Sequence, residues 1–231
     1  MRKVIMLYGP PGSGKGTQAN LLAGKLGMVH FDTGKYLEQV VHDPTTQKNP
    51  EIRKAGKIFD SGALVDPAFV LKLTAKKSKE IAKAGFGLVF SGSPRTVFEA
   101  FGDKNHEGLI SVLEKNFGKK NMVPIFLKIQ PELSILRNAK RKICSICGTA
   151  ILYSDATHHH KTCPLCGGGL KRRTVDNPKV FRTRIKEYKE RTLPILAGLK
   201  KRRYKIISIS GRPMPYRVFD NILKKLSAKR K

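Results

Sequence analysis

Short apolar runs recur along the chain, separated by longer stretches in which apolar residues repeat with helical spacing. The runs are Val4–Tyr8, Met28–Phe31, Gly87–Ser91, Met122–Ile129 and Tyr204–Ile209. Near-continuous apolar runs that alternate with helices are typical of a parallel sheet buried on both faces. The pattern therefore predicts an α/β fold in which a parallel sheet is flanked by helices.

The stretches between the runs predict the helices. Helical periodicity covers Gln18–Leu26, Lys35–Val41, Glu51–Phe59, Asp66–Lys83, Asn177–Lys200 and Tyr216–Lys231. Asp66 followed by Pro67 is typical of a helix start, because the carboxylate caps free N–H groups and proline fits the first turn. From Arg137 to Arg173 the periodicity breaks, and this basic, cysteine-containing stretch predicts a small inserted unit.

A glycine-rich segment, GPPGSGKGT at Gly9–Thr17, lies between the first apolar run and the first helix. Strand, glycine-rich turn and helix form the context in which such a segment binds phosphate. The glycines let backbone N–H groups approach phosphate oxygens, while the helix N-terminus and Lys15 add positive charge. The predicted phosphate-binding residues are Gly12, Ser13, Gly14, Lys15, Gly16 and Thr17. The hydroxyl residue expected directly after Lys15 is displaced by one position, because Gly16 stands there.

Three segments that follow predicted strands are candidates for one ligand site. They are the phosphate loop, the turn Asp32–Gly34 and the segment after Ser91. Ligands of parallel sheets bind at the carboxyl ends of the strands. We therefore expect these segments to share one rim of the sheet.

The chain carries an unusual positive charge. It has 46 Lys and Arg residues against 17 Asp and Glu residues, a formal net charge of +29. Nucleotide substrates explain a handful of these charges, and the excess favours non-specific contact with RNA or a ribosome. A salty cell interior or compositional drift explains it equally well. Trp is absent and the six Tyr residues are scattered, so no stacked-aromatic RNA motif accompanies the charge.

Neither a membrane span nor an export signal is expected. The chain has no apolar run of roughly 18 residues, and Val4–Leu7 is too short for the core of a signal peptide. We expect a cytoplasmic monomer without membrane contact.

The four cysteines form two CxxC pairs, Cys144 with Cys147 and Cys163 with Cys166. This spacing is that of two knuckles that close one tetrahedral zinc site. Four thiolates leave no open coordination position, so the prediction is a structural Zn²⁺ ion that folds the inserted unit. Disulfides or free thiols are the alternatives, and His158–His160 are expected to be solvated loop residues.

The GPPGSGKGTQ segment and the cysteine-containing insertion resemble the adenylate kinase family, in which a lid at this point of the chain closes over ATP. In many members the lid carries a four-cysteine zinc site. The resemblance covers nearly the whole chain. It implies a core P-loop domain at 1–31, 68–136 and 176–231, a monophosphate-binding helical insertion at 32–67, and a zinc-binding lid at 137–175.

The resemblance also implies a reaction, direct in-line phosphoryl transfer from ATP to AMP with Mg²⁺. Such transfer needs alignment, charge neutralisation and exclusion of water, which arginines on a closing lid supply. SGSPRT at residues 91–96 resembles the family's DGFPRT, whose arginine grips the monophosphate. The catalytic residues implied are Lys15, Arg95, Arg141, Arg173 and Arg184. The resemblance also implies that the phosphate-loop residues Gly12–Thr17, together with Arg137, bind ATP.

A monophosphate pocket is implied in the same way. Its predicted residues are Thr33, Gly34, Leu64, Val65, Arg95 and Glu99. Asp32–Gly34 resembles the family's STG turn, and Leu64 and Val65 resemble the pair that lines the base. The alternative for Asp32–Gly34 is a plain helix cap, and for Leu64 and Val65 it is two core aliphatics, which is the better interpretation of these two residues taken alone.

Three positions depart from the family. Ser91 replaces an Asp that helps to hold the water shell of Mg²⁺, and Glu38 replaces an Arg that pairs with the AMP phosphate. Either Lys35 or Arg53 takes over that charge, or the site has changed. Glu99 replaces a Gln that reads adenine. A carboxylate only accepts hydrogen bonds, which suits the two adjacent donors of guanine, so GMP is an alternative acceptor.

Two further classes of protein compete with the kinase. The first is a catalytically weakened kinase kept as a nucleotide-dependent RNA- or ribosome-binding protein. The second is a zinc-ribbon nucleic-acid binder, which leaves the phosphate loop unexplained. Because Lys15 and the arginines are retained, the sequence favours the enzyme.

Overall fold

Parallel strands form the centre of the computed structural model, which describes residues 3–151, 159–172 and 178–228. The strands are β1 (Val4–Tyr8), β2 (Met28–Phe31), β3 (Gly87–Phe90), β4 (Met122–Lys128) and β8 (Ile207–Ser210). They pair in the order β2-β3-β1-β4-β8, and every pair is parallel. The predicted fold class is confirmed. β8 begins later than Tyr204, because the N–H of that residue bonds to Leu199 O after a helix.

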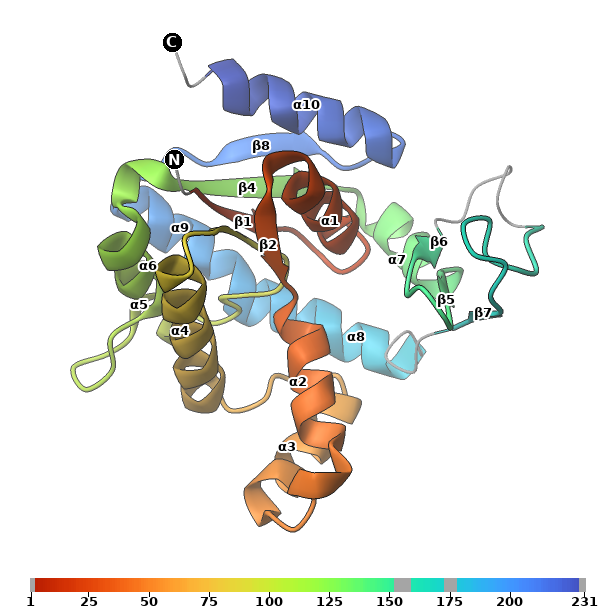
Figure 1. Cartoon of the computed structure of the whole chain (residues 1–231), viewed down its shortest axis with the longest axis horizontal. Helices are drawn as coiled ribbons and strands as arrows, with labels where there is room; N and C mark the ends of the chain where they lie inside the picture. The colour runs from red at the N-terminus through yellow and green to blue at the C-terminus, as the bar shows by residue number, and fades with distance from the viewer. Residues whose placement is uncertain (1–2, 152–158, 173–177, 229–231) are drawn as a thin grey trace.

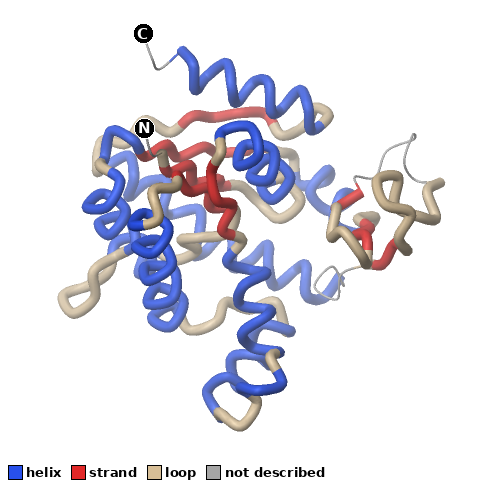
Figure 2. Tube along the Cα trace, in the orientation of Figure 1, coloured by secondary structure: helices blue, strands red, loops and turns tan. Residues whose placement is uncertain are grey.

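Helices surround this sheet (Figures 1 and 2). They are α1 (Lys15–Leu26), α2 (Thr33–His42), α3 (Pro50–Asp60), α4 (Pro67–Lys83), α5 (Val97–Phe101), α6 (Leu109–Phe117), α7 (Pro131–Ala139), α8 (Pro178–Glu187), α9 (Leu193–Lys201) and α10 (Pro215–Ser227). Asp66 caps α4 as predicted, since its Oδ1 accepts from Ala68 N at 3.0 Å. None of these described helices is long and apolar enough to cross a membrane.

Three shorter helical segments also lie within the described ranges. They are the 3₁₀ turns η1 (Pro44–Thr46) and η2 (Lys119–Asn121), and the π-helical turn η4 (Tyr188–Thr192). The helical periodicity over Asn177–Lys200 predicts one continuous helix. In the structure the π-helical turn separates α8 from α9, and π-helical turns occur frequently at functional sites.

Both faces of the central sheet are buried, as the apolar runs require. Val4, Met6 and Tyr8 of β1 pack on one face with α4, α6 and α9. Ile5 and Leu7 point to the other face, which α1 and α10 cover. Because side chains alternate along a strand, a run that is apolar at every position fits a sheet with helices on both sides.

Two smaller units extend from this core (Figure 1). α2 and α3 pack on each other, with Leu37, Val65 and Val70 in a small core between α2 and the start of α4. The second unit holds a small antiparallel sheet of β5 (Lys142–Cys144), β6 (Ala150–Ile151) and β7 (Leu170–Lys171). It contains the four cysteines, which matches the prediction of an inserted unit.

Candidate functional site

The phosphate loop connects β1 to α1 and is fixed by α7. Gly12 and Gly14 adopt φ values of 79° and 91°, which favour glycine because side chains with a Cβ are strained there. The Ser134 hydroxyl donates to Pro11 O at 2.6 Å and ties the loop to α7. α1 begins at Lys15 without a side-chain cap. Its first N–H groups are therefore left for an anion.

Lys15 folds back onto the loop. Its Nζ donates to Gly9 O at 2.7 Å and to Pro10 O at 3.0 Å. Burial, and after it the nearby guanidinium groups of Arg184, Arg95 and Arg141, together lower the pKa of Lys15 to about 7. A phosphate placed among these groups would restore the charged form.

A cavity of about 520 Å³ brings most of the predicted residues together. Its lining includes Gly12, Ser13, Gly14, Lys15, Gly16, Thr17, Gly34, Leu64, Arg95, Arg137, Arg141 and Arg184. The phosphate loop, the strand ends and the cysteine-containing unit therefore share one site. Arg173 lies outside the described residues.

Two of the arginines are held by backbone carbonyls. Arg95 Nε donates to Gly92 O at 2.8 Å. Arg137 donates from Nη1 to Gly211 O at 2.7 Å and from Nη2 to Arg212 O at 2.9 Å, and burial lowers its pKa. Fixing these side chains before a ligand arrives reduces the ordering cost of binding.

Three predicted monophosphate residues do not line the cavity. Thr33 is buried, and Val65 belongs to the small core between α2 and α4. The buried Glu99 forms a capping box. Its Oε2 accepts from Arg95 N at 2.9 Å and its Oε1 accepts from the Thr96 hydroxyl at 3.2 Å, while Thr96 Oγ1 accepts from Glu99 N at 3.0 Å. Burial raises the pKa of the Glu99 carboxyl.

Of the two candidates for the missing phosphate-pairing charge, Lys35 lines the cavity. Arg53 instead donates from Nη1 to Gln47 O at 2.7 Å and to Lys48 O at 3.3 Å. Those carbonyls belong to the turn before α3. The geometry therefore favours Lys35.

A polar network in the cavity wall was not predicted from the sequence. His30 Nδ1 lies 2.6 Å from Asn20 Oδ1, and His30 Nε2 lies 2.7 Å from Ser91 Oγ. All three residues line the cavity, and burial lowers the pKa of His30. The available signal for His30 was a polar residue near the carboxyl end of a short predicted strand, Met28–Phe31.

The π-helical turn adds further lining residues that the sequence did not indicate. Tyr188 and Thr192 face the cavity, as does Glu187 just before the turn. The Thr192 hydroxyl donates to Arg95 O at 2.8 Å, which links the turn to the backbone of the predicted monophosphate-gripping residue. Burial raises the pKa of Tyr188 to about 12.

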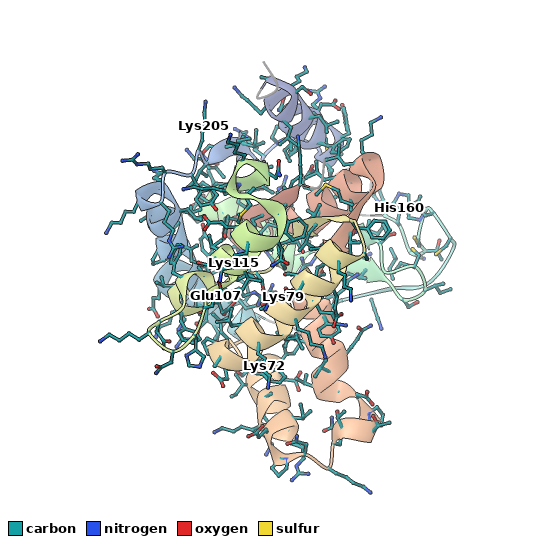
Figure 3. All side chains as sticks on the ribbon, turned by 60° about the vertical axis from the view of Figure 1, so that its left-hand side comes forward. Lys72, Lys79, Glu107, Lys115, His160 and Lys205 are labelled. Carbon is teal, nitrogen blue, oxygen red and sulfur yellow. The ribbon has the colours of Figure 1, made fainter. Side chains whose placement is uncertain are left out.

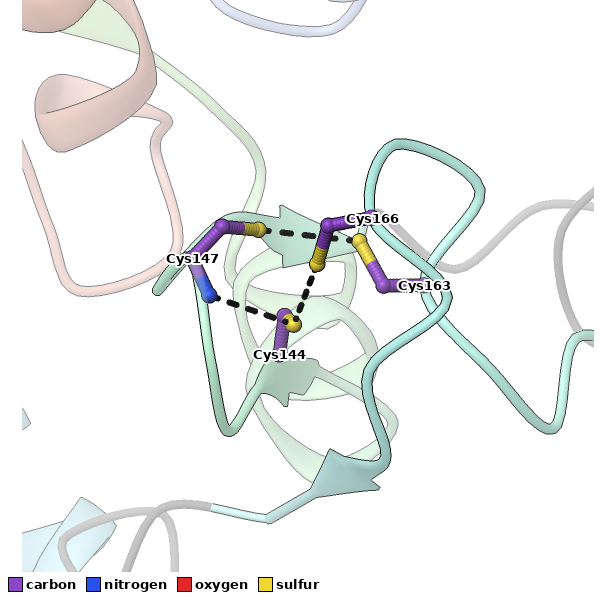
Figure 4. Close-up of side chains that lie close together, drawn as sticks. All are labelled: Cys144, Cys147, Cys163 and Cys166. Atoms are coloured by element: carbon purple, nitrogen blue, oxygen red, sulfur yellow. Dashed lines mark hydrogen bonds between the residues drawn. The ribbon is translucent and has the colours of Figure 1, made fainter.

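The four cysteines converge at one end of the small sheet (Figure 4). Their Sγ atoms all lie within 4.8 Å of one another. The Cys144 and Cys166 sulfurs are 3.4 Å apart, and the Cys147 and Cys163 sulfurs are 3.7 Å apart. Four sulfurs at tetrahedral Zn–S distances are separated by about 3.8 Å, so this donor set fits Zn²⁺.

The backbone around the sulfurs has the form of two knuckles. Ile146 N and Cys147 N each donate to Cys144 Sγ at 3.4 Å. Gly148 and Gly167 have φ values of 68° and 71°, which let the chain turn back after each pair. Such N–H donors stabilise thiolate ligands and orient them.

The fold and the cavity together are those of a P-loop protein in which a small four-cysteine unit lies beside the phosphate loop. A sequence model of the family described as adenylate kinase matches residues 7–204. The chain is 31% identical over 223 residues to the adenylate kinase of Chlamydia pneumoniae, covering 96% of each chain. It is 32% identical over 230 residues to that of Methanothrix thermoacetophila, covering 96% of this chain and 98% of the relative.

A third relative, the adenylate kinase of Zymomonas mobilis subsp. mobilis, is 34% identical over 198 residues, which is 83% of this chain and 82% of the relative. The chain belongs to the adenylate kinase family. The predicted family and enzyme class, a phosphotransferase that acts on nucleotides, are thereby confirmed.

Proposed function

We propose that the protein is an adenylate kinase that transfers the γ-phosphoryl group of ATP to AMP and yields two ADP. The observation that supports this best is the convergence of one lysine and several arginines on a single cavity, namely Lys15, Arg95, Arg141 and Arg184. Cations on several sides neutralise the charge that the migrating group spreads over its oxygens.

In the proposed reaction an oxygen of the AMP phosphate attacks the γ-phosphorus opposite the β–γ bridging oxygen. The new P–O bond forms as the bond to the bridging oxygen breaks, and the ADP formed from ATP leaves. The triphosphate lies on the N–H groups of the phosphate loop, with Lys15 released from Gly9 O and Pro10 O to reach it. Arg137 and Arg141 bind the phosphates of ATP in this proposal.

AMP lies on the other side of the cavity in this proposal. Arg95 grips its phosphate, and Lys35 supplies the charge that Glu38 does not. Gly34 and Leu64 line the nucleoside. Thr33, Val65 and Glu99 support this wall from behind.

Mg²⁺ is the metal that adenylate kinases use with ATP. Hard oxygen donors suit it, and the cavity wall offers the Thr17 hydroxyl and the Asp32 carboxylate. The charge of Asp32 lies close enough to Lys15 to oppose in part the lowering of the Lys15 pKa. When bound, the ion neutralises phosphate charge; Thr17 and Asp32 would hold it directly or through water.

The cysteine unit is proposed to be a lid over ATP, stabilised by structural Zn²⁺. This follows the predicted division into a core, a monophosphate-binding segment at 32–67 and a lid at 137–175. Ile143, Thr149 and Ile151 of this unit line the cavity. Closure over the substrates would exclude water, which otherwise competes as acceptor. We propose that the enzyme acts as a monomer in the cytoplasm.

The test is a coupled assay of ADP formation with ATP and Mg²⁺ and each of AMP, GMP, CMP and UMP. AMP should give the highest kcat/KM, because both carboxylate oxygens of Glu99 are engaged by Arg95 N and the Thr96 hydroxyl. A higher kcat/KM with GMP than with AMP would make GMP the acceptor in place of AMP. Turnover no higher than that of Lys15→Met with any acceptor would remove the kinase proposal.

A further inference from the structure

The rim of the central sheet opposite the cavity takes no part in the proposed reaction. Because the strands are parallel, their first residues lie along this rim in the order of the sheet. The pairing register aligns Val4 with Leu88 and with Met122, so the segments that lead into these strands are neighbours. Adjacent strand starts are about 4.8 Å apart, so the rim is about 20 Å long.

A lysine precedes each of these strands. Taken in sheet order, they are Lys25 before β2, Lys83 before β3, Lys3 before β1, Lys120 before β4 and Lys205 before β8. We call these five residues the basic rim. All but the half-buried Lys3 are exposed. Figure 3 turns this side of the molecule forward and labels Lys205, with Lys115 and Lys79 on the same side.

Local structure explains only part of this arrangement. Lys25 and Lys83 lie in the last turns of α1 and α4, where a cation complements the helix dipole. Lys3 and Lys205 lie outside any helix. Within the described ranges, no ion pair involves a member of the basic rim. The rim therefore holds a line of cations that the fold itself does not neutralise.

Neighbouring helix ends enlarge the positive surface. Lys200 and Lys201 lie in the last turn of α9, and Lys224 and Lys225 lie in the last turn of α10. Both helices pack along the sheet and run back toward the strand starts. These four lysines add to the positive charge on the side of the molecule opposite the cavity.

An exposed aromatic ring lies on the same rim. Phe86 directly precedes β3 and is 51% exposed, although it is a large apolar residue. Its backbone is held by a turn in which Phe86 N donates to Ile81 O at 3.2 Å and Gly85 has a φ of 89°. These contacts fix the backbone of Phe86 between the starts of β2 and β1, and its ring is exposed there.

We propose that the basic rim binds single-stranded RNA through its phosphate backbone, with one base stacked on Phe86. A row of cations that tracks a backbone, combined with an aromatic platform, is the arrangement that binds single strands with little sequence preference. A lone aromatic among lysines offers too little apolar surface for stable membrane insertion. The proposal does not depend on the kinase reaction, since no basic-rim residue lines the cavity.

The test measures binding of a labelled oligouridine RNA of about 15 nucleotides by fluorescence anisotropy over a range of salt concentrations. The rim variant is Lys83→Gln, Lys120→Gln and Lys205→Gln combined. Each lost phosphate contact lowers the slope of log K against log salt by about 0.7, so the slope should fall by about 2. Affinity at low salt should fall at least about tenfold.

A matched control variant removes the same number of positive charges from a different surface of the protein. It combines Lys48→Gln, Lys54→Gln and Lys57→Gln, which are exposed residues on α3 and the turn before it. The control should keep the wild-type salt slope. An equal loss in both triple variants would mean that net charge alone attracts RNA, and it would overturn the proposal.

Stacking is tested separately. Phe86→Ala should weaken binding about tenfold without changing the salt slope, and Phe86→Leu should restore little of it, because leucine has no π-face. Wild-type affinity in Phe86→Leu would remove the stacking role. All rim variants should melt within about 4 °C of wild type, since Lys83 loses only its interaction with the α4 dipole, and should keep wild-type ADP formation, which shows that they fold. Binding to phosphatidylserine vesicles but not to oligouridine would assign the rim to membranes and overturn the RNA proposal.

Discussion

Nε2 of His30 lies 2.7 Å from the hydroxyl oxygen of Ser91. The other ring nitrogen lies 2.6 Å from the amide oxygen of Asn20, which only accepts, so Nδ1 carries the ring proton. Nε2 then accepts from the Ser91 hydroxyl. A neutral pair from β2 and the end of β3 therefore occupies the wall where the family resemblance implies a carboxylate.

This neutral pair has a consequence for the metal. Ser91→Asp adds a negative charge beside the phosphates, which attracts Mg²⁺ more strongly. We expect the Mg²⁺ concentration for half-maximal ADP formation to fall about tenfold, equivalent to about 1.4 kcal/mol. Ser91→Ala, which removes the hydroxyl without adding charge, is the control and should not lower it. An unchanged Mg²⁺ requirement in Ser91→Asp would show that Ser91 does not face the metal.

The depressed pKa of Lys15 predicts proton uptake on nucleotide binding. In the free enzyme this pKa is about 7, whereas that of an unburied lysine is 10.5, so at pH 8 most of the Lys15 side chains are neutral. ATP favours the charged form, and binding at pH 8 should therefore take up close to one proton per site. Calorimetry in two buffers of different ionisation enthalpy measures this number.

The control for Lys15 is Lys15→Arg, which stays charged at pH 8 and should take up no proton. The lowered pKa of Lys15 in the folded chain also makes the stability of the protein depend on pH. Between pH 7 and 10.5 the unfolded chain holds the Lys15 proton and the folded chain does not, so this group's contribution to the free energy of unfolding rises with pH across that window. Equal proton uptake in both proteins would contradict the prediction.

The phosphate loop should tolerate alanine at one glycine and not at another. Gly12 has a φ of 79°, and an added Cβ would overlap Nδ2 of Asn138. At Gly16, in the first turn of α1, an added Cβ meets nothing within 4 Å. We expect Gly12→Ala to lower the free energy of unfolding by about 2 kcal/mol and Gly16→Ala to raise it by up to about 1 kcal/mol, measured by denaturant titration. Equal stability of the two variants would contradict this account.

Much of the fold was predictable because its signals are local. Unbroken apolar runs predicted the strands, and the lysine-containing glycine loop and the paired cysteines predicted the phosphate and metal elements. The His30–Ser91 contact was not predictable, because it depends on β2 lying beside β3, and these strands are far apart in sequence. The role of Glu99 also depends on tertiary context. An acid three residues after Thr96 fits a capping box, but the sequence alone does not show that its carboxylate is buried.

That capping box supplies a further prediction. Glu99→Ala removes the acceptor for Arg95 N and the Thr96 hydroxyl, and should lower the free energy of unfolding by about 1–2 kcal/mol. Thr96→Ala removes the reciprocal bond and should cost about 1 kcal/mol. In Glu99→Gln the ratio of kcat/KM for AMP to that for GMP should stay within about threefold of wild type, because the Glu99 carboxylate is engaged by Arg95 N and the Thr96 hydroxyl. Threefold corresponds to about 0.7 kcal/mol. A larger change would show that Glu99 reads the base.

Metal removal should unfold the lid and leave the core sheet intact. The proposed lid has a small core, in which Cys144, Ile151 and Cys163 are the buried residues among those described, so we expect most of its stability to come from the proposed zinc ion. Cys166→Ser should lower the zinc content from one ion per chain toward zero and abolish ADP formation, while far-UV circular dichroism of the helices that cover the sheet persists. Ser145→Ala is the control in the same knuckle: it loses the hydrogen bond to Gly169 O at 2.9 Å but no ligand, and should keep its zinc. Full activity of Cys166→Ser without zinc would mean that the lid folds by itself.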